Sequence, residues 1–150
     1  MKAQIIAVDF DGTIVKNEYP NIGKPLLFAF ETLKKLQDQG YILILWTYRS
    51  GKKLEEAVDF CKSNGLEFYA VNKSYPEEVM SDTISRKVNA DIFIDDRNIG
   101  GMIGWGEIYQ MLIGIEKTAP QVARRQTKKS KLKKKGFLSK FEEFFNEDQD

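Results

Sequence analysis

Residues 5–13 read Ile-Ile-Ala-Val-Asp-Phe-Asp-Gly-Thr, and this stretch decides the fold. It opens with a continuous apolar run, 5–8, which predicts a short strand buried in a parallel sheet. Asp9 and Asp11 follow two residues apart, so their carboxylates project from the same side of an extended chain. Because an unpaired carboxylate is costly to bury beside an apolar run, we expect a cation or hydrogen bonds close to Asp9.

Apolar runs and helical spacings alternate along the chain as far as residue 118. Further strands are expected at 41–46, 68–71 and 92–94. Helices are expected from Leu26 to Leu36, from Leu54 to Cys61, more weakly through Ile84 and Val88, and last at 107–116. This alternation predicts an α/β domain of three layers, Rossmann-like, with a mostly parallel sheet.

Polar residues stand at the ends of three of the expected strands. Asp9 follows the first strand, Thr47 follows the second, and the pair Asp95-Asp96 follows the last. Right-handed crossovers bring these carboxyl ends to one edge of the sheet, where open α/β domains bind their ligands. Adjacent carboxylates repel one another unless they share a cation. Oxygen ligands from Asp9, from Asp96 and from a backbone carbonyl near Asp11 suit Mg²⁺.

The two spaced carboxylates can act together on a phosphoryl group. One attacks phosphorus, while the other protonates the leaving oxygen and later deprotonates water. Thr47 and Lys87 are candidates to bind the phosphoryl oxygens. Taken singly, Thr47 is more typical of a helix cap or turn and Asp11-Gly12 of a turn, and Lys87 is one of many lysines.

The order of these motifs resembles the haloacid dehalogenase superfamily over about residues 3–116. The motifs are Asp-Phe-Asp-Gly-Thr at 9–13, then Thr47, Lys87 and Asp95-Asp96, each placed relative to an apolar strand. The resemblance implies that Asp9 is the nucleophile and Asp11 the general acid and base. It also implies that the Thr47 hydroxyl binds phosphate, that Lys87 is an orienting cation, and that Asp95 and Asp96 bind the metal. Asp96 is expected to be the direct ligand.

The interval between Lys87 and Asp95 is shorter than in many members of this superfamily, which leaves Arg86 or Lys73 as alternative cations. The chain also has no room for the cap domain that many members insert. We therefore expect an open site, which suits a small phosphorylated metabolite or a phosphate on a macromolecule. Tyr48 and Arg49 follow Thr47 and are expected to contact the leaving group.

These observations predict a magnesium-dependent phosphomonoester hydrolase that works through an aspartyl-phosphate intermediate. Two alternatives keep the same fold: a phospho-receiver-like signalling domain and a catalytically silent binding module. The chain has no histidine, which excludes Ser-His-Asp triads and His-ligated zinc. Its single cysteine excludes an internal disulfide and favours the cytoplasm, and no apolar stretch is long enough to span a membrane.

The composition changes beyond residue 118, where we place the end of the catalytic core. Residues 119–136 carry a run of Lys and Arg and are expected to form a basic linker, able to make weak contact with nucleic acid. Residues 137–150 place five apolar side chains at helical spacing and predict an amphipathic helix. Such a helix can pack on the core or on a second copy of the chain, giving a homo-oligomer.

Overall fold

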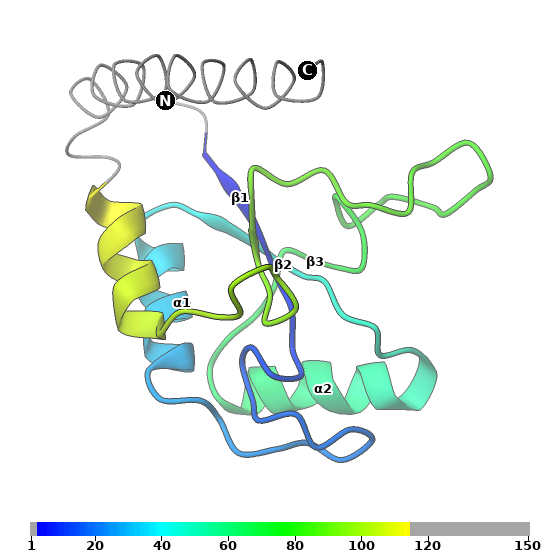
Figure 1. Ribbon diagram of the computed structural model, residues 1–150. Helices are drawn as coiled ribbons and strands as arrows, with labels where there is room; N and C mark the ends of the chain where they lie inside the picture. The colour runs from blue at the N-terminus through cyan, green and yellow to red at the C-terminus, as the bar shows by residue number, and fades with distance from the viewer. Residues whose placement is uncertain (1–2, 115–150) are drawn as a thin grey trace, which may run out of the picture. The chain divides into compact units, whose positions relative to one another are not determined.

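The computed structural model describes residues 3–114 (Figure 1). The predicted basic linker, 119–136, and the predicted helix, 137–150, lie outside the described residues. The chain divides into two units after Tyr109, and each strand found among residues 3–114 belongs to the first. None of the helices within 3–114 has both the length and the apolar character needed to cross a bilayer.

The described unit is built on a four-stranded parallel sheet. The strands are β1 (Ile5–Val8), β2 (Ile42–Leu45), β3 (Ala70–Val71) and β4 (Ile92–Ile94), in the order β3-β2-β1-β4. The apolar runs that predicted β1 and β4 match their bounds, whereas β2 and β3 are shorter than the runs 41–46 and 68–71. The prediction of an α/β domain with a mostly parallel sheet is confirmed.

Two helices cover one face of this sheet: α1 (Ala29–Asp38) and α2 (Gly51–Ser63). The chain advances from β1 through α1 to β2, and from β2 through α2 to β3, so right-handed crossovers put both helices on the same side. Phe30 of α1 lies 6.0 Å from Phe60 of α2, measured between ring centroids, and Phe10 lies 6.3 Å from Phe60. These three rings join the helices to the chain that leaves β1.

Helix α1 begins three residues later than the apolar spacing suggested. The backbone N–H of Leu26 donates to the carbonyl oxygen of Ile14, so Leu26 pairs with the loop that follows β1. Phe28 then adopts a left-handed conformation, with a φ of 64°, before the helix starts. A third helix begins at Trp105 and continues through residue 114, close to the prediction of 107–116.

The connection from β3 to β4 differs from the prediction. Residues 72–91 form no helix, although Ile84 and Val88 have helical spacing. Short polar side chains bind the local backbone or each other instead: the N–H of Lys87 donates to Ser85 Oγ, and the hydroxyls of Ser81 and Thr83 are 2.9 Å apart. Such local bonds compete with helix formation. The helix expected in this crossover is therefore absent.

All the polar strand ends meet at one edge of the sheet. The N–H of Asp9 donates to the carbonyl of Ile94 at 3.0 Å, and the N–H of Trp46 donates to Val8 at 2.8 Å. The N–H of Asn72 extends the pairing of β2 with β3 by donating to Leu45 at 2.7 Å. Between β1 and β4 the described chain forms no helix or strand other than α1, β2, α2 and β3, so no separately folded domain is inserted there.

Candidate active site

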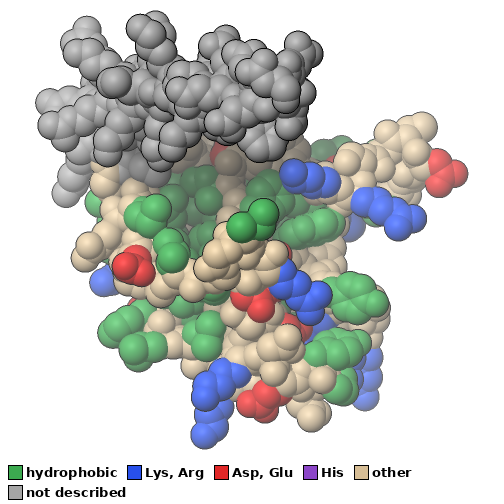
Figure 2. Space-filling view, in the orientation of Figure 1, with side chains coloured by type: hydrophobic (Ala, Val, Ile, Leu, Met, Phe, Trp, Pro, Cys, Tyr) green, Lys and Arg blue, Asp and Glu red, His purple; other side chains and the backbone are tan. Residues whose placement is uncertain are grey.

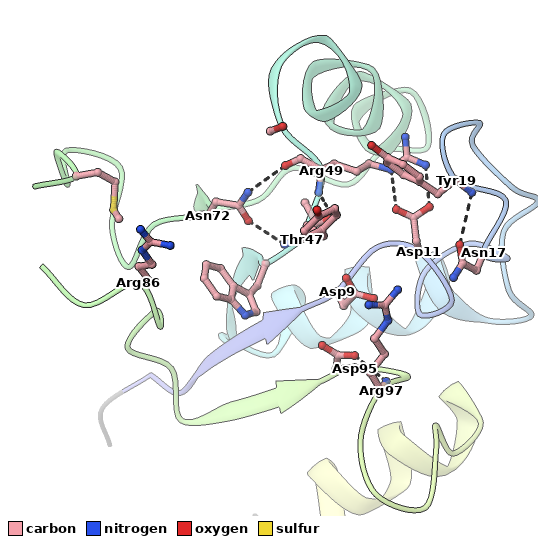
Figure 3. Close-up of a pocket in the computed structure, with 14 residues that line it drawn as sticks. Asp9, Asp11, Asn17, Tyr19, Thr47, Arg49, Asn72, Arg86, Asp95 and Arg97 are labelled. Atoms are coloured by element: carbon pink, nitrogen blue, oxygen red, sulfur yellow. Dashed lines mark hydrogen bonds and ion pairs between the residues drawn. The ribbon is translucent and has the colours of Figure 1, made fainter. Parts of the chain in front are cut away.

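A cavity of about 880 Å³ opens at the carboxyl edge of the sheet (Figure 3). Several residues that the sequence motifs singled out line it together: Asp9, Asp11, Thr47, Tyr48, Arg49 and Asp95. They come from the ends of β1, β2 and β4. The prediction that separate motifs converge on one crevice is therefore confirmed in geometry.

Three carboxylates form an acidic cluster beside the cavity. One oxygen from each of Asp9, Asp95 and Asp96 lies within 4.8 Å of the other two. Oδ1 of Asp96 is buried and accepts no hydrogen bond among the described residues. Clustered oxygens with one buried and unsatisfied are what a hard divalent cation satisfies, so the residues fit the Mg²⁺ that the sequence predicted. The carboxylate of Asp11 is not in this cluster; the ligand predicted near that position was a backbone carbonyl.

Thr13 connects the two ends of the acidic cluster. Its hydroxyl donates to Asp9 Oδ2 at 3.0 Å and accepts the backbone N–H of Asp96 at 3.0 Å. The carbonyl of Thr13 in turn accepts the indole N–H of Trp105 at 2.8 Å. Thr13 is fully buried, so the hydroxyl and the carbonyl at the centre of this network are shielded from water. Sequence reasoning quoted Thr13 within its motif but gave it no role.

Asp9 is poised between its two protonation states. The pKa of Asp9 is raised from 3.8 to about 7, chiefly by burial and to a smaller extent by the charges of Asp95 and Asp96, against the lowering effect of hydrogen bonds from the backbone of Phe10 and from Thr13. This raised pKa belongs to the protein without a metal ion. A divalent cation held by the cluster would favour the ionised, nucleophilic form of Asp9.

Gly12 lets the motif loop approach Asp96. A Cβ at this position would lie 2.2 Å from Asp96 Oδ2, and the φ of Gly12 is +84°. We expect Gly12→Ala to displace the Asp96 carboxylate, to destabilise the fold by about 2 kcal/mol and to weaken Mg²⁺ binding at least roughly tenfold. The melting temperature with and without Mg²⁺ measures both effects.

Gly40 provides the matched control for this substitution. Its φ is +91°, yet no atom lies within 4 Å of the Cβ that alanine would add. Gly40→Ala should therefore show only the strain of the left-handed backbone and keep the full Mg²⁺-induced shift. Equal Mg²⁺-induced shifts in both variants and in the wild type would show that Gly12 has no part in the metal site.

Arg49 forms a buried ion pair, which differs from the contact with the leaving group that the sequence predicted. Its side chain is fully buried and grips Asp11 with two bonds, Nε to Oδ2 and Nη2 to Oδ1, both 2.7 Å long. The guanidinium also donates to the backbone carbonyls of Pro20 at 3.1 Å and Asn21 at 2.7 Å. The sequence analysis expected Arg49 to contact the leaving group. Such a contact would require Arg49 to give up these partners.

The surroundings of Arg49 hold it in the charged form. The hydrogen bonds to Asp11 raise the pKa of Arg49 above its ordinary value. Its guanidinium carbon lies 5.1 Å from the ring centroid of Phe10 and 5.3 Å from that of Tyr19. Figure 3 shows the Asp11 carboxylate turned toward Arg49 and away from Asp9 and Asp95. Two of the predicted site residues are thus paired with each other.

Thr47 is positioned by a residue that sequence reasoning missed. The backbone N–H of Thr47 donates to Asn72 Oδ1 at 2.8 Å, and Asn72 Nδ2 donates to the carbonyl of Arg49 at 3.4 Å. The hydroxyl oxygen of Thr47 accepts the N–H of Arg49 at 3.2 Å, so its own proton points elsewhere and can be donated. The position of Asn72 just after an expected strand was the available signal.

The cavity takes its exposed cations from Arg86 and Arg97. In the view of Figure 3 they lie on opposite sides of the cavity. Lys87 does not line the cavity: its Nζ lies 5.0 Å above the ring of Phe93. Lys73 is also absent from the lining. Of the three cations that the sequence left open, the structure brings only Arg86 to this site.

The buried thiol of Cys61 offers no second reactive centre. Burial raises the pKa of Cys61 to about 12, so it stays protonated and unreactive. On the face drawn in Figure 2, Lys and Arg side chains are scattered among acidic and apolar ones over the described surface. That face of the described residues carries no continuous basic patch.

No protein-family model and no curated protein matches the chain. A solved structure of a conserved protein from Bacteroides thetaiotaomicron is 56% identical to it. The match covers 75% of this chain and 92% of that protein, with a TM-score of 0.72. The agreement thus extends over nearly the whole of the Bacteroides protein.

Proposed function

This chain belongs to the family of the conserved Bacteroides thetaiotaomicron protein, and we propose that it is a magnesium-dependent phosphomonoester hydrolase of the haloacid dehalogenase type. One observation carries the proposal: Asp9 meets Asp95 and Asp96 within 4.8 Å, and Asp96 Oδ1 is buried without a partner. The resemblance of the motif order to that superfamily supports it.

Asp9 is the nucleophile in this proposal. Its carboxylate lines the cavity and attacks phosphorus, which forms an aspartyl phosphate and expels the leaving group. The hydroxyl of Thr47, whose oxygen already accepts the N–H of Arg49, donates its proton to a phosphoryl oxygen. Water then attacks phosphorus and regenerates the Asp9 carboxylate.

The acidic cluster would hold the metal ion through Asp9, Asp95 and Asp96. When bound, Mg²⁺ supplies positive charge that offsets the repulsion among these carboxylates and the phosphoryl oxygens. Thr13 fixes the orientation of Asp9 and the backbone of Asp96, so both ends of the cluster keep their spacing. This function needs no cap, because Arg86 and Arg97 provide positive charge at the open rim.

Steady-state hydrolysis of 4-nitrophenyl phosphate tests the proposal. We expect turnover with Mg²⁺ and none with a chelator, and we expect Asp9→Asn to be inactive under both conditions. Stable phosphorylation of one aspartate without turnover would favour a phospho-receiver instead. Turnover that is equal with chelator and with Mg²⁺ would contradict the metal-dependent mechanism.

Arg86 and Lys87 are adjacent in the sequence, but only Arg86 is expected to bind the phosphate group. Arg86 lines the cavity, whereas Lys87 lies over Phe93. We expect Arg86→Ala to raise KM for a phosphate ester by about fivefold, because an exposed cation that attracts phosphate is worth about 1 kcal/mol. Lys87→Ala should leave KM within about twofold of wild type. The reverse ranking would restore Lys87 as the orienting cation.

A further inference from the structure

Trp105 is a buried residue that the proposed mechanism does not use. It is the first residue of the helix 105–114, and it is only 2% exposed. Its indole N–H donates to the carbonyl oxygen of Thr13 at 2.8 Å, although the two residues are 92 positions apart in the sequence. A buried tryptophan usually finds a partner for this N–H. Because the partner here is Thr13, Trp105 is connected to the acidic cluster.

The hydroxyl of Thr13 sets the spacing between two members of the acidic cluster. It donates to Asp9 Oδ2 at 3.0 Å and accepts the backbone N–H of Asp96 at 3.0 Å. One oxygen atom therefore bridges the side chain of Asp9 and the backbone of Asp96. One carboxylate oxygen from each of these two residues lies within 4.8 Å of the other. A shift of Thr13 would change that spacing directly.

The backbone of Thr13 needs support from outside its own loop. Gly12, the residue before it, has a φ of +84° and no Cβ to restrict the chain. The N–H of Thr13 donates to the carbonyl of Phe10 at 3.3 Å, which is longer than a typical N–H···O bond. The bond from Trp105 is shorter, at 2.8 Å, and buried. The indole therefore holds Thr13 more firmly than the bond within the loop does.

Contacts with α1 fix the start of the helix that carries Trp105. Tyr109 lies one turn further along this helix, and its hydroxyl accepts a hydrogen bond from Gln39 Nε2 at 3.0 Å, just past the end of α1. Lys35 of α1 places its Nζ 5.6 Å from the centroid of the Tyr109 ring. Ile108 of the same helix is only 7% exposed. Trp105 thus holds Thr13 from a support that is itself anchored to the helical layer.

We propose that Trp105 is a positioning residue for the metal site: its indole N–H fixes Thr13, and Thr13 spaces the carboxylates that hold Mg²⁺. The inference rests on the metal site of the proposed function and assigns a role to a residue that does not touch the metal. Outer hydrogen bonds that orient metal ligands typically change the affinity for the metal by about 10-fold to 100-fold. Trp105 acts through Thr13, so we expect the lower end of this range.

The choice of metal distinguishes positioning from general support of the fold. Mg²⁺ requires near-ideal octahedral ligand geometry, whereas Ca²⁺ accepts irregular and flexible geometries. Loosening the spacing of the acidic cluster should therefore weaken Mg²⁺ binding more than Ca²⁺ binding. A substitution that only destabilises the fold has no reason to separate the two ions.

Calorimetric titration of the full chain with Mg²⁺, and separately with Ca²⁺, tests the inference. Trp105→Phe keeps an aromatic ring but has no N–H to donate. We expect it to raise Kd for Mg²⁺ by about tenfold and Kd for Ca²⁺ by less than about threefold. Ile108→Ala is the matched control, because it removes a buried side chain of the same helix. It should lower the melting temperature and leave both Kd values within about twofold of wild type.

Failure of the inference differs from failure of the proposed function. If the wild type binds no Mg²⁺, the metal site itself is contradicted, and the inference with it. If Trp105→Phe binds Mg²⁺ within about twofold of the wild-type Kd, or loses affinity for both ions equally, only the role of Trp105 is overturned. Hydrolysis of an ester enters none of these results.

Proton exchange in the wild type tests the same inference without any variant. Coupling between two binding events is reciprocal, so a bond that favours Mg²⁺ by about tenfold is favoured by Mg²⁺ to the same extent. The backbone N–H of Ile108, which donates to Gly104 at 3.0 Å, reports the general stabilisation of the helix. Followed by NMR, exchange of the Trp105 indole proton should slow about tenfold more than that of the Ile108 amide when Mg²⁺ saturates the protein. Equal slowing of the two protons would overturn the inference.

Discussion

Replacing Arg49 with alanine is expected to lower the free energy of unfolding by about 3–5 kcal/mol, the largest stability effect predicted for this chain. The side chain of Arg49 is fully buried, and that of Asp11 is only 14% exposed. Removing the guanidinium leaves the Asp11 carboxylate without its counter-charge and frees the carbonyls of Pro20 and Asn21. Urea denaturation followed by circular dichroism measures the loss.

Arg97 supplies the control for this prediction. It lines the same cavity but is exposed, and the described residues give its guanidinium no ion pair. Arg97→Ala should change stability by less than about 0.5 kcal/mol. A double variant, Arg49→Ala with Asp11→Asn, should recover part of the loss because the buried charge is gone. If Arg49→Ala proves as stable as Arg97→Ala, the buried pair does not organise this site.

Replacing Asp9 with asparagine should abolish turnover and yet stabilise the metal-free protein at pH 8. The pKa of Asp9 is about 7 in the folded protein and 3.8 ordinarily, so the folded state holds this proton more tightly than the unfolded state does. Stability then falls as pH rises from about 4 to about 7, and the full penalty remains above that. Asparagine removes it, a gain of about 2–4 kcal/mol at pH 8.

Thermal unfolding in chelator across pH 5 to pH 8 tests the prediction for Asp9. The advantage of Asp9→Asn should shrink as pH falls, because Asp9 becomes protonated and uncharged in the wild type. Added Mg²⁺ should stabilise the wild type at pH 8 and have little effect on the variant. A variant that is less stable than the wild type at pH 8 in chelator would contradict the desolvated Asp9 on which this argument depends.

The features that could be predicted from sequence are those encoded by short-range patterns. Continuous apolar runs predicted the bounds of β1 and β4. A strand buried on both faces of a parallel sheet is apolar throughout, so its ends coincide with the first polar residues. The crossover rule then placed Asp9, Thr47 and Asp95 at one edge. These two patterns are enough to predict the acidic cluster.

The features that could not be predicted depend on irregular segments. Arg49 and Asp11 are 38 residues apart in the sequence, and Asn72 and Thr47 are 25 residues apart. No short-range pattern can therefore predict either contact. The segment 72–91 forms neither helix nor strand, so the helical spacing of Ile84 and Val88 does not assign its side chains to a face. The family resemblance favoured Lys87 over Arg86, whereas the irregular backbone brings Arg86 to the cavity.

The most direct test of the central claim is to trap the covalent intermediate on Asp9. The wild-type protein is mixed with 4-nitrophenyl phosphate and Mg²⁺, quenched in acid within milliseconds, digested, and examined by mass spectrometry. The account predicts one phosphoryl group on the peptide that contains Asp9, localised to that residue by fragmentation and absent when chelator replaces Mg²⁺. Rapid turnover with phosphate on no peptide, or with phosphate on Asp95 instead, would contradict Asp9 as the nucleophile.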